Sequence, residues 1–426
     1  MHPPVDKAIL VGAPERGQDP RVADEHLEEL ARLTDTAGGI VVGTLRQRLA
    51  HPHPRFYIGE GKADELRELV TARAATLVIF DEELTPAQGK NLEDLLDVRV
   101  MDRSELILDI FATRARSREA RLQVELAQLE YLLPRLRRMW SHLSRIRGGI
   151  GLRGPGETQL ETDRRLVGLR ISDLKQKLRE VAKSREQQRK ARQGAFRAAL
   201  VGYTNAGKSS LLRALSGADL FVEDRLFATL DSATRSVDLG SGHTALITDT
   251  VGFIRKLPHH LVASFRSTLE EAREADVLLH VIDASHADWE EQRQVVREVL
   301  EDLGLDKAER IMVFNKVDRL THAEEESLRA RVRALESRPA VFVSAHQAAS
   351  LEAVRETLKA RIRARLAHVV VRFSSSDGEA LAELYREGEV LERNEAEGVL
   401  VVTVRLPRAL VGRLAERPGF AVEEVA

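Results

Sequence analysis

The stretch "LVGYTNAGKSSL" at residues 200–211 decides the fold of the region around it. Gly202, Gly207, Lys208 and Ser209 have the spacing G-x-x-x-x-G-K-S of a phosphate-binding loop. The apolar run "AALV" before the loop predicts a strand, and "KSSLLRAL" after it predicts a helix. In such a unit the backbone N–H groups and the helix N-terminus surround the β-phosphate, Lys208 neutralises the β- and γ-phosphates, and the Ser209 hydroxyl binds Mg²⁺. The sequence therefore predicts a nucleotide site.

A carboxylate and a glycine follow at the end of another predicted strand. Asp249-Thr-Val-Gly252 closes the run "TALITD", which places the Asp249 carboxylate at the carboxyl edge of the sheet. There Asp249 can hold Mg²⁺, commonly through water, and the Gly252 amide can meet the γ-phosphate.

Two later segments predict which base is bound. Asn315-Lys316-Val317-Asp318 ends one strand, and Ser344-Ala345 ends the next. The Asp318 carboxylate can accept hydrogen bonds from the guanine N1–H and amino groups together, which adenine cannot satisfy, and the Ala345 amide can donate to the guanine O6. A polar turn would explain one such segment alone. The ordered set at strand ends predicts a guanine-nucleotide site.

The 426 residues are too many for one ordinary domain. Apolar runs typical of strands alternate with helical patterns in the N-terminal part of the chain and again after residue 195. This alternation favours a multidomain α/β fold class. We expect four parts: an N-terminal α/β domain at 1–111, an antiparallel helical hairpin at 112–194, a P-loop GTPase domain with a Ras-like parallel sheet at 195–367, and a small C-terminal α+β domain at 368–426.

The expected hairpin carries most of the positive charge. Between Ala112 and Arg197 there are 22 lysines and arginines against 9 aspartates and glutamates, although the net charge of the chain is −2. Leucines and other apolar residues recur at heptad spacing on both sides of the glycine-rich stretch "RIRGGIGLRGPGETQLETDRR" at 145–165. The segment therefore predicts either contact with a polyanion or a solvated helical surface.

Two negative findings limit the function classes. The chain has no cysteine, which excludes disulfides, thiolate catalysis and cysteine metal sites. No targeting leader or transmembrane run is evident, so we expect a soluble, cytoplasmic protein without stable membrane insertion, monomeric when free. The stretch "YIGEGKADEL" at 57–66 resembles a phosphate loop only loosely, and a plain strand–turn–helix connection is favoured over an additional nucleotide pocket.

These motifs together resemble GTPases of the Obg–HflX group, and within it the HflX family most closely. The resemblance rests on "GYTNAGKSSLLRAL", "LFATLDSATR", "DTVGFIRKLPHHLVASFRSTLEE" and "NKVD", and outside them on "RFYIGEGKADEL" and "GGIGLRGPGETQLETDRR". It spans nearly the whole chain and is weakest in residues 368–426. It implies a ribosome-associated GTPase that binds the large subunit in the GTP state and splits stalled or idle ribosomes, with the N-terminal domain and hairpin reaching towards the peptidyl-transferase region.

The resemblance also implies roles for single residues. Thr229 in "FATLD" is similar to the switch threonine that touches Mg²⁺ and the γ-phosphate, the alternative being a surface turn. Asn205 matches a position that similar GTPases use to bind K⁺, or it stabilises the loop through its amide. Phe253 stands where many small GTPases have a water-orienting glutamine. A phenyl ring cannot orient water, so either a partner completes the site or another group does this work.

The expected site combines catalytic, metal-binding and nucleotide-binding residues. The residues expected to act in catalysis are Lys208, Thr229, Gly252 and Asn205, and those expected to bind Mg²⁺ are Ser209, Thr229 and Asp249. The residues expected to contact GTP or GDP are Gly202, Tyr203, Thr204, Asn205, Ala206, Gly207, Lys208, Ser209, Ser210, Phe227, Thr229, Asp249, Gly252, Asn315, Lys316, Asp318, Ser344 and Ala345.

The hairpin tip is the expected RNA contact. Arg145, Arg147 and Arg153 lie on or beside glycines that let the backbone approach phosphates closely, and ribosomal RNA is the partner that the resemblance implies. The glycines could instead only turn the hairpin. Two other functions stay open: an assembly factor that docks on immature large subunits without splitting ribosomes, and an ATP-dependent RNA remodeller that works through the N-terminal domain.

Overall fold

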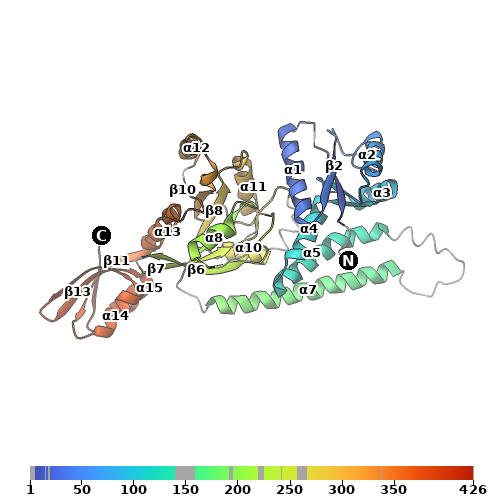
Figure 1. The fold of residues 1–426 in the computed structure, drawn as a ribbon. Coiled ribbons are helices and arrows are strands. Elements are labelled where there is room, and N and C mark those ends of the chain that lie inside the picture. The colour runs from blue at the N-terminus through green and yellow to red at the C-terminus, as the bar shows by residue number, and fades with distance from the viewer. Residues whose placement is uncertain are drawn as a thin grey trace.

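The computed structural model describes residues 5–139, 159–190 and 195–425, apart from residues 15, 18–19, 219–224, 241, 257–265 and 337. Figure 1 shows three sheet domains in a row, with two long antiparallel helices beside the first of them. This arrangement confirms the predicted α/β multidomain fold class. Among the helices described, none has the length and apolar character needed to cross a membrane.

The N-terminal domain is a parallel sheet with helices on both faces. Its strands have the order β2-β1-β3-β4. Leu77 and Ile79 of β3 belong to the core under α1 and α4, whereas Val78 and Phe80 belong to the core under α2 and α3, so the strand is apolar throughout. The elements are β1 (Lys7–Gly12), α1 (Pro20–Thr36), β2 (Ile40–Arg46), α2 (Glu60–Arg73), β3 (Leu77–Phe80), α3 (Pro86–Leu96), β4 (Arg99–Asp102) and α4 (Arg103–Arg114).

The hairpin consists of α5 (Arg118–Met139) and α7 (Gln159–Lys190). Apolar positions of both helices face each other, with Leu174 of α7 fully buried, and exposed ion pairs such as Arg170–Glu125 (Nε–Oε1 2.7 Å) join the two arms. α5 also packs against the N-terminal domain through Val124, Ala127 and Tyr131. The tip on which Arg145, Arg147 and Arg153 were expected lies outside the described residues.

The central domain has a six-stranded sheet of order β10-β9-β8-β5-β7-β6. All neighbours are parallel except β6, which pairs antiparallel with β7. The sequence pattern does not predict this edge strand. Only Val237 and Leu239 of "ATRSVDLG" are buried, so the segment lacks the apolar run that predicts the other strands of this sheet. The elements are β5 (Phe196–Gly202), α8 (Lys208–Ser216), β6 (Ala233–Gly240), β7 (His243–Asp249), α10 (Arg266–Arg273), β8 (Val277–Asp283), α11 (Trp289–Asp302), β9 (Arg310–Asn315), the 3₁₀ turn η1 (Val317–Arg319), α12 (His322–Leu335), β10 (Ala340–Phe342), the 3₁₀ turn η2 (Ala348–Leu351) and α13 (Glu352–Arg365).

The C-terminal domain is an antiparallel sheet of order β12-β13-β11-β14. Two helices cover one face and share a core with the alternating residues of β11 and β13. The final strand was not anticipated, because "AVEE" is short and mostly exposed at the sheet edge. The elements are β11 (Leu366–Ser374), α14 (Gly378–Glu387), β12 (Glu389–Ala396), β13 (Val399–Pro407), α15 (Arg408–Ala415) and β14 (Ala421–Glu424).

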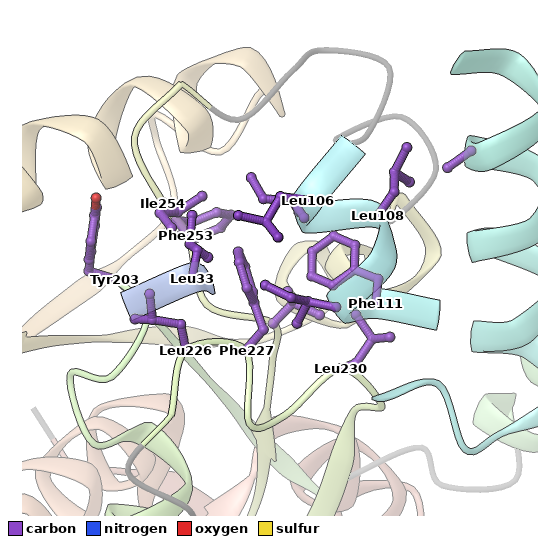
Figure 2. Close-up of a cluster of buried hydrophobic side chains, with 14 of the residues drawn as sticks. Leu33, Leu106, Leu108, Phe111, Tyr203, Leu226, Phe227, Leu230, Phe253 and Ile254 are labelled. Carbon is purple, nitrogen blue, oxygen red and sulfur yellow. The ribbon is translucent and has the colours of Figure 1, made fainter. Parts of the chain in front are cut away.

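One continuous apolar core joins the N-terminal domain, the hairpin and the central domain. Figure 2 shows its middle, where Leu106 and Phe111 of α4 face Phe227 and Phe253 of the central domain. The rings of Phe111 and Phe227 meet edge to face, with centroids 4.7 Å apart. The central domain is therefore packed against the N-terminal domain through the loops that surround the predicted nucleotide site.

Candidate functional site

The phosphate loop lies where the sequence predicts it, between the end of β5 at Gly202 and the start of α8 at Lys208. Its first and last glycines are required by the fold. The φ angles of Gly202 and Gly207 are +155° and +91°, and a Cβ on either would lie 2.2 Å from a neighbouring atom, the Val281 carbonyl oxygen or the Asn315 Nδ2. The loop is thus held tightly between β5, β8 and the "NKVD" segment.

A cavity of about 420 Å³ opens over this loop and the start of α8. Nine predicted site residues line it: Thr204, Asn205, Gly207, Lys208, Ser209, Ser210, Phe227, Thr229 and Gly252. The Lys208 ammonium is buried and donates to the carbonyls of Gly202 (3.1 Å) and Tyr203 (2.8 Å). Burial lowers the pKa of Lys208 to about 8, although the nearby Asp249 carboxylate acts in the opposite direction. A buried cation in a small polar cavity is suited to bind phosphate.

Three oxygen-bearing side chains meet at one side of the cavity. Ser209 Oγ donates to Asp249 Oδ2 at 2.5 Å and lies 2.6 Å from Thr229 Oγ1. The second carboxylate oxygen of Asp249, Oδ1, is buried and has no partner among the described residues. Burial raises the pKa of Asp249, an effect that a bound cation would oppose. Two hydroxyls and a carboxylate are hard oxygen donors, so this set fits Mg²⁺.

The segments predicted to bind the base lie together at the same sheet edge. Asn315 is buried, donates through Nδ2 to the Ala206 carbonyl (3.0 Å) and accepts from the Ala345 amide (3.2 Å). Lys316 donates to the Asn205 carbonyl and to Asp283, both at 2.7 Å. Asp318 lies exposed on η1, where its carboxylate is accessible to a ligand. The structure therefore brings the phosphate loop and the "NKVD" and "SA" segments into one site.

A second cavity extends from α8 towards Ala345 and has an empty volume of about 1070 Å³. Ser210 and Ala345 were predicted as site residues, but Arg213 and His346 were not. In the first cavity, Arg225, Ala228 and Thr250 were likewise missed. For His346, Ala228 and Thr250, the available signal was a position directly beside a predicted site residue in the sequence. Ser344 is fully buried, and its backbone N–H donates to Ser350 Oγ (2.9 Å), so it shapes this loop from within.

Two predicted nucleotide contacts also belong to the interdomain core. Phe227 lines the cavity, but its ring packs against Phe111 of α4. The Tyr203 hydroxyl donates to the Glu29 carboxylate of α1 and accepts from the Arg255 backbone N–H at 2.9 Å. Burial and the Glu29 charge raise the pKa of Tyr203 well above its usual value, so the phenol remains protonated. The Tyr203 side chain therefore contacts the N-terminal domain.

Both loops beside the γ-phosphate region are held by other domains. Lys256 forms an ion pair with the buried Asp81 at the end of β3, and the Asp81 carboxylate also pairs with Arg103. After Thr229, the Asp231 carboxylate accepts the backbone N–H groups of Arg116 and Ser117 at 3.0 Å each, at the start of α5. The segments around Thr229 and Gly252 are thus connected directly to the hairpin and the N-terminal domain.

Three family models match successive parts of the chain. "GTP-binding GTPase N-terminal" matches residues 24–112, "GTP-binding GTPase Middle Region" matches residues 114–192, and "50S ribosome-binding GTPase" matches residues 197–316. Together they cover more than half of the sequence.

Similar proteins match over most of their length. GTPase HflX of Magnetococcus marinus is 44% identical over 429 residues, which cover 99% of this chain and 98% of that protein. GTPase HflX of Escherichia coli K12 is 43% identical over 389 residues, 90% of each chain. Among solved structures, a GTP-binding protein from Sulfolobus solfataricus in complex with GDP is 24% identical with a TM-score of 0.45, covering 84% of this chain and 98% of that one.

Proposed function

Because this chain belongs to the HflX family of GTPases and hydrolyses GTP, we propose that its GTP-bound form binds the ribosomal large subunit and separates stalled or idle ribosomes. GTP binding requires the segments around Thr229 and Gly252 to meet the γ-phosphate. The same two segments hold the hairpin through Asp231 and the N-terminal domain through Lys256. The two segments thus border the nucleotide site and also contact the other domains, which supports a position of the hairpin that depends on the bound nucleotide. The proposal rests on this observation.

The nucleotide site supplies the chemistry. We propose that Ser209, Thr229 and Asp249 hold Mg²⁺, which neutralises charge on the β- and γ-phosphates. Lys208 neutralises the same phosphates, and the Gly252 amide donates to the γ-phosphate. Asn205, whose φ of +60° turns the loop and whose carbonyl accepts from Lys316, is proposed as the K⁺ ligand. Hydrolysis should then slow when K⁺ is replaced by Na⁺.

Base recognition is proposed to rest on Asp318 and Ala345. Asp318 is exposed at the end of β9, ready to accept two guanine N–H groups. Asn315 ties the base-binding segments to the phosphate loop through its two hydrogen bonds, so both halves of the nucleotide are held in a fixed relation.

Co-sedimentation with ribosomes and with separated subunits tests the proposal. The chain should bind large subunits with a non-hydrolysable GTP analogue and be released with GDP, and 70S particles should separate into subunits. Binding to free large subunits without separation would instead indicate an assembly factor. Equal behaviour with both nucleotides would overturn the proposed switch.

The proposed RNA contact has its own test. Replacing Arg145, Arg147 and Arg153 by glutamine should weaken large-subunit binding and reduce its salt dependence. The matched control replaces three exposed arginines of the C-terminal domain, Arg386, Arg393 and Arg408. Equal loss of binding in both triple variants would show that net charge, and not the hairpin tip, governs the interaction.

An ATP site in the N-terminal domain receives no support from its sheet edge. In such a sheet the ligand position lies between the carboxyl ends of β1 and β3. There Glu82 accepts the Ala13 N–H (3.0 Å), and Asp81 pairs with Arg103 and Lys256. The cations and the backbone N–H at this position are thus already occupied by protein carboxylates and not by a phosphate. ATP hydrolysis that persists in Lys208→Ala would support an RNA remodeller of this kind, and its loss would argue against one.

A further inference from the structure

Phe253 occupies the position of a water-orienting side chain but is directed away from the cavity. Its ring is 2% exposed and belongs to the interdomain core (Figure 2). Its backbone is fixed to the phosphate loop, since its N–H donates to the Gly202 carbonyl (3.0 Å) and its carbonyl accepts the Thr204 N–H (2.7 Å). The Phe253 ring therefore does not position the water that attacks GTP, and this work falls to a partner or to another group of the site.

Thr204, on the wall of the same cavity, has a buried hydroxyl without a hydrogen-bond partner in the described part of the chain. Thr204 lines the cavity, is 6% exposed, and its Oγ1 finds no partner among the described residues. The hydroxyls of Ser209, Thr229 and Thr250 on the cavity wall are all hydrogen-bonded. A buried hydroxyl without a hydrogen bond lowers the stability of the folded protein by about 1–3 kcal/mol. This cost points to a hydrogen-bond partner that arrives with the ligand.

The surroundings of Thr204 place its side chain beside the groups proposed to bind the γ-phosphate. A Cβ built on Gly252 would lie 2.8 Å from Thr204 Cα, and 2.9 Å from both Thr204 Cγ2 and Lys208 Nζ. Gly252 and Lys208 are the groups proposed above to bind the γ-phosphate. These distances place the Thr204 methyl against Gly252, and the hydroxyl is bonded to the same carbon as that methyl, so it lies within two bond lengths of this contact.

We propose that the Thr204 hydroxyl positions the attacking water in GTP hydrolysis. Oγ1 accepts a hydrogen bond from the water, so that a lone pair of the water oxygen faces the γ-phosphorus. The new P–O bond forms as the bond from the γ-phosphorus to the β,γ-bridging oxygen breaks, and its electron pair leaves with GDP. Both protons of the water end on the phosphate product, and Thr204 keeps its own proton. This proposal rests on the nucleotide site proposed above and is independent of the ribosome.

Two variants of Thr204 separate a catalytic hydroxyl from a structural side chain. Thr204→Val keeps the shape and removes the hydroxyl, whereas Thr204→Ser keeps the hydroxyl and removes the methyl. In single-turnover assays, T204V should hydrolyse GTP at least tenfold more slowly, with affinity for a non-hydrolysable analogue within twofold of the parent. T204S should retain the rate within about threefold. Thr234→Val is the matched control, because Thr234 is bonded to Thr248 (2.9 Å) on the sheet, outside the cavity.

A transition-state analogue gives a second readout. GDP with aluminium fluoride imitates the γ-phosphate together with the attacking water, so T204V should lose binding of aluminium fluoride while it still binds GDP. Parent-like hydrolysis by T204V, or equal loss of analogue affinity and rate, would overturn the role of Thr204. Failure of the parent chain itself to bind GTP would instead overturn the nucleotide site.

Discussion

At the residue scale, burial controls the charge of Lys208. Its pKa is lowered to about 8, whereas the phosphates of a nucleotide favour the charged ammonium. Binding must therefore raise this pKa, which means that the protein takes up protons when it binds nucleotide near pH 8.

The first prediction concerns this proton uptake. At pH 8 about half of the Lys208 side chains are neutral, so nucleotide binding should take up about half a proton, and less at pH 7. Above pH 8 the affinity should fall by up to about tenfold per pH unit. Titration calorimetry in two buffers with different ionisation enthalpies measures the uptake directly. An absence of uptake at pH 8 would contradict the burial of Lys208 in the free protein.

The second prediction concerns base selection by Asp318. In Asp318→Asn the side chain can no longer accept both guanine N–H groups, so GTP affinity should fall roughly 10–100-fold and the preference should shift towards xanthine nucleotide. Competition binding with GTP and XTP measures the shift. Asp306→Asn, at the opposite end of β9, is the matched control. Unchanged GTP affinity in Asp318→Asn would remove the guanine assignment.

At the scale of single elements, the start of α5 depends on a residue from another domain. The Asp231 carboxylate accepts two backbone N–H groups just before the helix, and Ser117 Oγ accepts a third from Ala120 (3.0 Å). Helix N-termini expose N–H groups that need acceptors, and here the Ser117 hydroxyl supplies one to the first turn of α5. The Asp231 carboxylate holds Ser117 through its backbone N–H and its hydroxyl, so the loop after Thr229 fixes the cap of the hairpin helix.

The third prediction tests this cap. Asp231→Ala leaves the N–H groups of Arg116 and Ser117, just before α5, without their acceptor, at a cost of about 1–3 kcal/mol. Hydrogen exchange of residues 116–121 should accelerate about 5- to 150-fold, while exchange in β5 stays unchanged. Asp238→Ala removes a carboxylate that accepts the Gly240 N–H (2.8 Å) at the end of β6, and it should leave α5 protected. Equal protection of α5 in both variants would show that Asp231 does not cap it.

At the scale of the whole molecule, the N-terminal and central domains share one interior. Their apolar residues form a continuous core, and a buried polar network connects Tyr203 of the phosphate loop to Glu29, Arg103 and Asp81. Burial of Arg103 is offset by the two carboxylates that it pairs with, which raise its pKa. The two domains should therefore unfold together.

The fourth prediction tests this cooperativity. Glu29→Ala leaves Arg103 with one carboxylate and the Tyr203 phenol without its acceptor, at a cost of about 3–5 kcal/mol. We expect the single unfolding transition of these domains to separate into two transitions. Calorimetry and tryptophan fluorescence measure this separation. Glu65→Ala, which removes the exposed Lys62–Glu65 pair, is the control and should change little. Joint unfolding in Glu29→Ala would contradict a role for this network in coupling the domains.

The sequence by itself determined the features that depend on neighbouring residues. The phosphate loop needs Gly202, Gly207 and Lys208 within one strand–loop–helix unit, and parallel strands bring Asp249 and Asn315 to the same edge because their carboxyl ends always meet there. Heptad spacing in the hairpin follows from the period of one helix. These are short-range rules, so they can be read without coordinates.

Only the tertiary structure decided which side chains of the predicted site point away from the cavity. Tyr203 and Glu29 are 174 residues apart, and no local pattern predicts that the phenol would contact α1 and not the nucleotide. The burial of Phe253 between domains and the unpartnered hydroxyl of Thr204 have the same origin. Strand β14 pairs with the distant β11, and no local pattern predicts that pairing. The packing of segments that are far apart in the chain sets which side chains are buried and which pair across domains. The sequence displays the residue types, but this packing decides their chemistry.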